Sequence, residues 1–160
     1  FYADELSVAI RYPRGSQKEN VKKLEYPSIE YSQYGDKASE TAIVTYGRIT
    51  SEAIDAVDKL KEKGTSVFLL ALNQIKPIPE QVFELLSDKK EIFFFEEGIK
   101  SGGVGEKLGS VLLEKGIFCR YSVTAVENKF VEQASVGDLI TTYKLDTQSI
   151  INKITEKKYD

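Results

Sequence analysis

Short runs of apolar residues alternate along this chain with longer segments in which apolar residues recur at every third or fourth position. The first pattern is typical of strands covered on both faces, and the second is typical of amphipathic helices. Strands are predicted at 28–35, 41–47, 66–72, 91–98 and 117–123. Helices are predicted to begin at Thr50 or Ser51, at Pro79, at Val104, at Ser135 and at Asp146.

Capping residues and glycines indicate where several of these helices begin and end. Gly64 and Gly116 each follow an amphipathic stretch and are typical of helix ends. Ser135 and Asp138 have the spacing of a capping box, and Asp146 can cap the last helix. The boundaries therefore agree with the apolar pattern.

Strands and helices in alternation require crossover connections, which place the strands parallel and the helices on both faces of the sheet. We therefore predict an α/β fold with three α/β/α layers and a mainly parallel sheet of about five strands. Segment 28–35 alternates polar and apolar residues, as an edge strand does.

Pro13 should end a further strand at 7–12, since proline lacks the N–H that a strand ladder needs. Residues 15–27 are polar and are predicted to form an exposed linker. The predicted organisation is thus 1–14 from a preceding unit, 15–27 as linker and 28–160 as a compact domain. The chain begins without methionine, so we expect it to be part of a longer protein.

Composition narrows the classes of function. The 22 basic and 25 acidic residues leave a net charge of -3, which gives no electrostatic basis for binding nucleic acid or an acidic membrane. No apolar run approaches the roughly 20 residues of a membrane helix. The single cysteine excludes an internal disulfide, and the lack of histidine removes the commonest general base and metal ligand.

The glycine-rich segment 101–110 begins a predicted helix after a strand, a place that favours anions. It matches neither a P-loop nor the dinucleotide-binding fingerprint. A nucleotide or anion site at Gly103–Gly109 is one interpretation. The other is a tight loop that lets the helix approach the sheet closely.

Glu96 and Glu97 are candidates for an acid/base pair, but adjacent residues at a strand end point in opposite directions. A solvated strand terminus, or a polar contact with another domain, is the favoured interpretation. Cys119 is expected within a strand as a small buried apolar residue, because no histidine is present to activate it.

Arg14 is the main candidate for a substrate-binding residue. Pro13 fixes the backbone before it, Gly15 leaves room for a ligand, and a guanidinium suits a phosphate through two parallel hydrogen bonds. Arg11 is the second candidate, although it should point to the other face and form a structural ion pair. For Arg14 an interdomain salt bridge is the alternative, and spacing alone favours neither.

The segments AIRYPRG, IVTYGR, IKPIPEQ, EEGIKSGGVGE and NKFVEQAS occur in this order. Together they resemble the carboxyl-terminal portion of the 1-deoxy-D-xylulose-5-phosphate synthase family, and the resemblance covers essentially the whole chain. IRYPRG is specific to that family. The other segments are shared with transketolases and with the β subunits of 2-oxoacid dehydrogenases.

The resemblance implies a homodimeric transferase of three α/β domains, with thiamine diphosphate and Mg²⁺ held between the first two. Such an enzyme joins a unit derived from pyruvate to glyceraldehyde 3-phosphate, for isoprenoid, thiamine and pyridoxal synthesis. Residues 1–14 would then end the pyrimidine-binding domain. Residues 28–160 would be a transketolase C-terminal-like domain with one antiparallel edge strand. Arg14 would bind the substrate phosphate.

The same resemblance implies no catalytic, cofactor-binding or metal-binding residue within this piece, which we expect to be inactive alone. It favours a bacterial cytoplasm over a plastid. Asn73 and Gln74 stand where the family often has arginine, and Gln133 where it often has histidine. The alternatives are the carboxyl-terminal half of another transketolase-like enzyme and a free-standing anion-binding or nucleotide-binding regulatory module.

Overall fold

Five strands form one twisted sheet in the computed structural model, which describes residues 9–12 and 18–156. The spatial order is β1-β3-β2-β4-β5. Strand β1 is antiparallel to β3, and the other neighbours are parallel. The strands are β1 (Tyr31–Gly35), β2 (Thr41–Tyr46), β3 (Phe68–Leu72), β4 (Glu91–Ile99) and β5 (Arg120–Val126). The predicted mainly parallel sheet with one antiparallel edge strand is confirmed.

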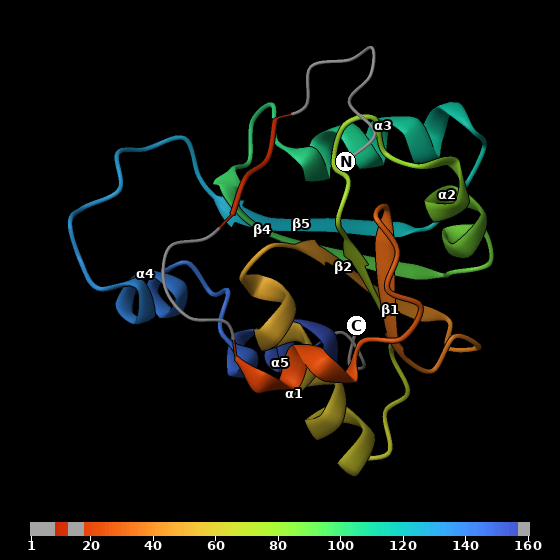
Figure 1. The fold of residues 1–160 in the computed structure, drawn as a ribbon, viewed down its shortest axis with the longest axis horizontal. Coiled ribbons are helices and arrows are strands. Elements are labelled where there is room, and N and C mark those ends of the chain that lie inside the picture. Colours follow the sequence, from red (N-terminus) through yellow and green to blue (C-terminus); the bar gives the residue numbers. More distant parts are fainter. Residues whose placement is uncertain (1–8, 13–17, 157–160) are drawn as a thin grey trace.

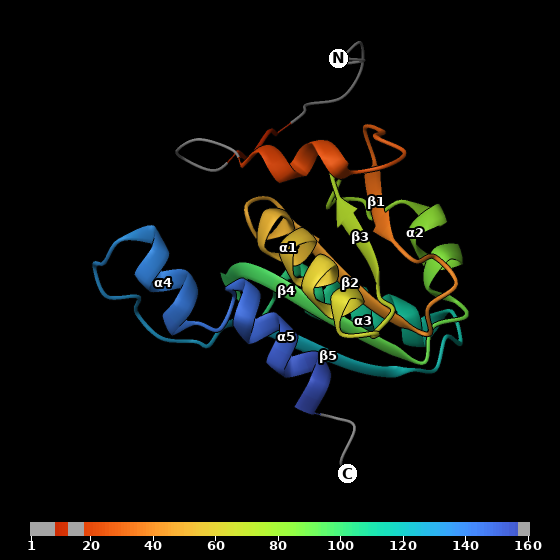
Figure 2. The ribbon, with the colours of Figure 1, turned by 90° about the horizontal axis from the view of Figure 1, so that it is seen from below.

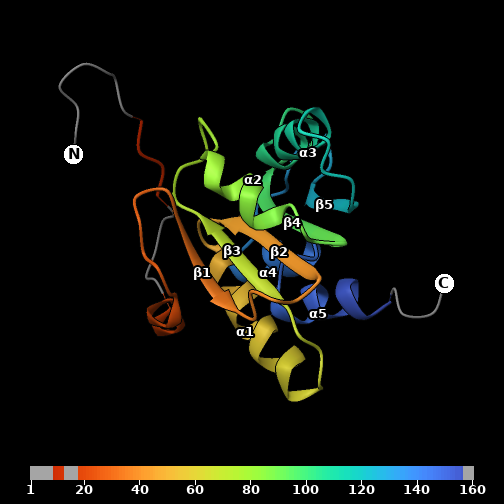
Figure 3. The ribbon, with the colours of Figure 1, turned by 90° about the vertical axis from the view of Figure 1, so that its right-hand side faces the viewer.

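Helices cover both faces of this sheet (Figures 1 and 3). On one face lie α1 (Ile49–Glu62) and α5 (Thr147–Thr155), and on the other lie α2 (Glu80–Leu86) and α3 (Val104–Glu114). The short α4 (Val136–Thr142) projects beyond the sheet in Figures 1 and 2. The predicted three-layer α/β/α architecture is therefore confirmed.

Two apolar cores share the strands between them, because successive side chains of a strand point to opposite faces. In β4, Phe93 and Phe95 pack with α1 and α5, whereas Ile92 and Phe94 pack with α2 and α3. All four side chains are buried. The same alternation sends Glu96 to the α3 side and Glu97 to the other.

Several predicted boundaries were wrong by a few residues, since the strands predicted from 28 and from 66 begin at Tyr31 and at Phe68. Helix α1 begins at Ile49 with Arg48 as its N-cap and no side-chain capping bond, so Thr50 and Ser51 lie inside the helix and are buried. Strand β5 begins at Arg120 and not at 117. Arg120 N donates a backbone hydrogen bond to Lys90 O, next to the start of β4. The caps predicted at Ser135 and Asp146 are confirmed by side-chain hydrogen bonds.

The segment predicted as an exposed linker contains a 3-10 helix, η1 (Glu19–Lys23), which packs against α1. Val21 and Leu24 contact the core, and Asn20 Nδ2 donates to Ser51 O at 2.8 Å. Lys18 Nζ lies 2.5 Å from Glu52 Oε1. The segment after residue 17 is thus attached to the domain and does not hang free.

Only Ala9–Tyr12 of the strand predicted at 7–12 is described, and these four residues are exposed and outside any strand. The partners of that strand were expected in a preceding unit, so the assignment of 1–14 to that unit stays a prediction. No helix among residues 9–12 and 18–156 is long and apolar enough to cross a membrane.

Candidate functional site

The carboxyl ends of β2, β4 and β5 carry the polar and apolar features that a site could use. Glu96 lies there, fully buried, at the start of α3. Its carboxylate accepts hydrogen bonds from Tyr46 Oη at 2.9 Å, from Val104 N at 3.2 Å and from Gly105 N at 3.1 Å. A strand end and a helix start are thereby tied to one side chain.

This arrangement corrects the expectation that Glu96 lies at a solvated strand terminus. Two of the first backbone N–H groups of α3 have no partner within the helix, and the helix dipole favours a negative charge there. The carboxylate of Glu96 occupies that place and compensates its own burial through three hydrogen bonds. The two glutamates do not converge, so the acid/base pair is not formed.

The glycines of segment 101–110 allow α3 to pack closely against Glu96 and the sheet. A Cβ atom on Gly103 would collide with the carboxylate of Glu96. A Cβ on Gly105 would lie 2.8 Å from Val123 Cγ1, and one on Gly109 would lie 2.8 Å from Tyr121 Cε1. The interpretation as a tight loop is therefore the better one.

An external anion finds few free donors at the start of α3. Val104 N and Gly105 N donate to Glu96, and Gly102 N donates to Glu106 Oε2 at 2.7 Å. The hypothesis of a free-standing anion-binding module required free N–H donors in this segment, and these three N–H groups already donate to carboxylates of the chain itself.

Two tyrosines surround the buried carboxylate and stay protonated. Burial first, and the negative charge of Glu96 second, raise the pKa of both Tyr46 and Tyr121 well above the usual range. Tyr121 Oη donates to Gly105 O at 2.6 Å. The hydroxyls act as fixed donors and not as bases.

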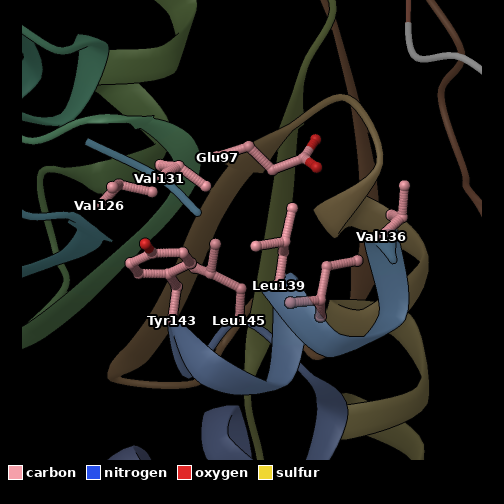
Figure 4. Close-up of a pocket in the computed structure, with 8 residues that line it drawn as sticks. Glu97, Val126, Val131, Val136, Leu139, Tyr143 and Leu145 are labelled. Atoms are coloured by element: carbon pink, nitrogen blue, oxygen red, sulfur yellow. The ribbon is translucent and has the colours of Figure 1, made fainter. Parts of the chain in front are cut away.

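Glu97 points to the other face of the sheet, where its Oε1 lies 3.5 Å from Arg48 Nε. It stands at the rim of an apolar pocket of about 130 Å³, which Figure 4 shows between the strand ends and α4. The pocket is lined by Glu97, Val126, Val131, Val136, Leu139, Ile140, Tyr143 and Leu145. Apart from the glutamate and one tyrosine hydroxyl, this lining offers contact area and no catalytic chemistry.

The two arginine candidates differ in what the structure says of them. Arg14 lies outside the described residues, so its role stays a prediction. Arg11 is described and exposed, and its positive charge opposes the upward shift of the Tyr46 pKa. The arm 9–12 that carries Arg11 lies at the end of the sheet toward which α4 projects in Figures 1 and 2.

The remaining candidates have structural surroundings. Cys119 lies before β5, half-buried and not within the strand as expected, and burial raises the pKa of its thiol. Asn73 Nδ2 donates to Ser28 O at 2.7 Å, and Gln74 Nε2 donates to Pro77 O at 2.9 Å. Gln133 is exposed before α4. Asn73 and Gln74 thus hold local backbone in place.

Sequence reasoning missed the burial of Glu96 and the pocket beside Glu97. A signal was available for the first, since an acidic residue at the end of a buried strand precedes a glycine-rich helix start by eight positions. That spacing lets a strand-end carboxylate meet the helix N–H groups. The pocket depends on where the loop after β5 carries α4 and has no comparable local signal.

Similarity to known proteins agrees with this architecture. The family model "Transketolase, C-terminal domain" matches residues 31–150. The chain is 31% identical over 153 residues to a 1-deoxy-D-xylulose-5-phosphate synthase of Caldanaerobacter subterraneus, covering 94% of this chain and 24% of that protein. It is 36% identical over 155 residues to the Clostridium perfringens synthase, covering 93% and 25%. The chain thus spans about a quarter of the length of these curated relatives.

Two solved structures share the fold. A split-gene transketolase, described as an inactive β4 tetramer, superposes with a TM-score of 0.65 at 21% identity, covering 78% of this chain and 40% of the other. The transketolase of Campylobacter jejuni superposes with a TM-score of 0.58 at 14% identity, covering 78% and 18%. With the sheet order, the antiparallel edge strand and the matched residues in agreement, this chain belongs to the transketolase C-terminal domain family.

Proposed function

We propose that this chain is the carboxyl-terminal part of a 1-deoxy-D-xylulose-5-phosphate synthase. The parent enzyme condenses pyruvate with D-glyceraldehyde 3-phosphate to give 1-deoxy-D-xylulose 5-phosphate and CO₂. The observation that carries the proposal is the 36% identity over 93% of the chain to a protein of that name. The IRYPRG segment supports the same assignment. The parent is proposed to be a homodimer in a bacterial cytoplasm.

Thiamine diphosphate, bound with Mg²⁺ in such a parent, supplies the electron sink that makes decarboxylation of pyruvate possible. Among residues 9–12 and 18–156, no group of three or more acidic, cysteine or histidine side chains could hold a metal ion. The described residues therefore offer no such ligand group for Mg²⁺, and no catalytic step is assigned to them. In this proposal the preceding domains hold both.

The contribution proposed for this chain is an anchor for the substrate phosphate. Arg14 donates two parallel hydrogen bonds to the phosphate of glyceraldehyde 3-phosphate, which a planar guanidinium does better than an ammonium group. Arg11 adds positive charge near the same edge of the sheet, where it already acts on Tyr46. Both residues lie in the RYPRG segment.

The test is Arg14→Ala in the full-length parent enzyme. A charge-assisted bidentate contact contributes about 2–3 kcal/mol, so kcat/KM for glyceraldehyde 3-phosphate should fall by about 30–150-fold. The KM for pyruvate should change little. Arg14→Lys should recover only part of the loss, and Arg11→Ala should have the smaller effect. Equal losses for both substrates would remove Arg14 from the phosphate site.

A second candidate, one subunit of a split transketolase-like enzyme, is favoured by the superposition on a split-gene transketolase. The 160-residue chain alone, given thiamine diphosphate, Mg²⁺ and both substrates, should form no product under either proposal. Adding a separately expressed polypeptide with the two preceding domains should restore turnover if the enzyme is split. Turnover only when all domains share one polypeptide supports the synthase arrangement.

A further inference from the structure

The end of the molecule around α4 carries apolar side chains that are wholly or partly exposed in the part of the chain that the structure describes. Tyr143 among them also contacts the core, and Lys129 Nζ lies 5.1 Å from its ring centroid. Phe130, Val131 and Val136 are 101%, 46% and 44% exposed. Val131 and Val136 also line the pocket of about 130 Å³, together with Leu139 and Tyr143 (Figure 4). These five residues are called the α4 face below. Exposed apolar groups that gather in this way are typical of contact surfaces.

The α4 face is well formed although its side chains are wholly or partly exposed. Ser135 Oγ accepts a hydrogen bond from Asp138 N at 3.2 Å and caps the helix. Leu145, just after the helix, is buried and fixes its end to the core, yet no residue of α4 itself is buried. Ile140 packs against the core and anchors the helix, whereas Val136 on the same helix stays exposed and is available to a partner.

The described arm 9–12 lies at the same end of the sheet as α4 (Figures 1 and 2). Ile10 and Tyr12, in the described arm 9–12, are 60% and 84% exposed. The arm therefore carries uncovered apolar groups at the end of the sheet toward which α4 projects (Figures 1 and 2).

We propose that the α4 face docks against the upstream part of the same polypeptide, the part that precedes this arm. This inference rests on the proposed function, which makes the chain the end of a longer enzyme. The curated relatives are about four times as long as this chain, since it spans 24–25% of them, so a large partner is attached at this edge. Attachment through a short arm gives the upstream part a high effective concentration at the α4 face.

An exposed aromatic at the other end of the sheet gives a matched control. Phe118 is 83% exposed and lies before the start of β5, whereas Phe130 follows the end of that strand. Aspartate in place of either residue meets solvent in this domain, so neither change should unfold it. Only Phe130→Asp should place a charge in the proposed contact.

The experiment is hydrogen exchange of segment 127–143 in the full-length parent, in Phe130→Asp and in Phe118→Asp. We expect the backbone amides of this segment to exchange on the order of tenfold more slowly in the parent than in the 160-residue chain. Phe130→Asp should abolish that protection, and Phe118→Asp should leave it unchanged. Equal exchange in the parent and the 160-residue chain would overturn the inference.

A second copy of the chain is the competing partner for the α4 face, and the same hydrogen-exchange measurement distinguishes it from the upstream part. Protection of 127–143 that appears in the 160-residue chain as its concentration rises, and that Phe130→Asp removes, would overturn the assignment to the upstream part. Product formation by the wild-type parent is measured separately. A parent that turns over its substrates with 127–143 unprotected rejects this inference alone, whereas a parent without that activity rejects the proposed function.

Discussion

The three hydrogen bonds to Glu96 join the end of β4, the end of β2 and the start of α3. Glu96→Ala would leave Tyr46 Oη, Val104 N and Gly105 N without their acceptor in a buried place. Each unsatisfied donor costs free energy, so we expect the free energy of unfolding to fall by about 3 kcal/mol in a urea titration.

Glu97→Ala is the control for Glu96→Ala, because the neighbouring side chain is 43% exposed, lies at the rim of the pocket and makes a long ionic contact with Arg48. Its effect should stay within about 0.5 kcal/mol. Glu96→Gln should be milder than Glu96→Ala, since an amide oxygen still accepts. Similar losses for Glu96→Ala and Glu97→Ala would show that the buried carboxylate is not what holds the start of α3.

Glu52 gives a prediction for the dependence of stability on pH. Burial raises the pKa of this carboxyl, but hydrogen bonds from Lys18 and Thr147 outweigh burial and hold it below its ordinary value of 4.5. A lowered folded pKa means that the carboxylate stabilises the fold above the ordinary value and stops doing so as the pH falls through the folded value.

The measurement for Glu52 is the urea midpoint of wild type and Glu52→Gln across the acid range. Wild type should be the more stable at pH 7, and the difference should shrink as the pH drops below about 4. Glu62→Gln, an exposed carboxyl at the end of the same helix, is the control and should show little difference at any pH. A difference between wild type and Glu52→Gln that is constant with pH would contradict the ionic role.

At the scale of elements, α3 depends on how closely its glycines approach the sheet. Gly105→Ala would bring a Cβ to within 2.8 Å of Val123 Cγ1 and 2.9 Å of Phe94 Cδ1, which is closer than packed atoms allow. Forcing a methyl group into such a core costs about 1–3 kcal/mol. We expect the midpoint of urea unfolding to fall accordingly.

Gly137→Ala is the matched substitution in α4, where a Cβ would lie 3.9 Å from its neighbour Ser135 Oγ. Alanine favours the helix over glycine by up to about 1 kcal/mol, so this variant should be as stable as wild type or slightly more stable. If Gly105→Ala proved as harmless as Gly137→Ala, close packing would not be the reason for the glycines of α3.

The features that the sequence predicted correctly depend on local interactions, whereas the features that it missed depend on contacts between distant segments. Ser135 and Asp146 cap helices through bonds within four residues, so a local pattern is enough to find them. The burial of Glu96 depends on α3 returning to the end of β4, and the start of α1 depends on a turn at Gly47, whose φ is +63°. Contacts between segments that are distant in the sequence determine the burial of Glu96 and the start of α1. The periodicity of apolar residues holds no information about such contacts.

The α4 face was beyond sequence reasoning for a related cause. The pattern predicted a short capped helix, and that helix is present. Nothing in the pattern indicates that Val136 of this helix stays exposed beside an apolar pocket, because that depends on where the preceding loop carries the helix. Arg14 could be singled out from its neighbours in the sequence, yet its role depends on groups in other domains.

At the scale of the whole domain, two apolar cores lie back to back on one sheet. Ile54 of α1 belongs to one core and Leu108 of α3 to the other, and both side chains are fully buried. Because β2, β3 and β4 contribute side chains to both cores, neither helical layer can separate without exposing strands that the other layer needs. The two layers should therefore unfold together.

Ile54→Ala and Leu108→Ala test this coupling in the 160-residue chain. Each truncation removes buried methyl groups and leaves a cavity, which costs about 2–5 kcal/mol. Each should move one common transition to lower urea, with far-UV circular dichroism and tyrosine fluorescence giving the same midpoint. Leu113→Ala, on α3 but 65% exposed, should leave that midpoint nearly unchanged. Midpoints that differ between the two probes in either core variant would mean that one layer opens while the other persists, and that the shared strands do not make the domain a single cooperative unit.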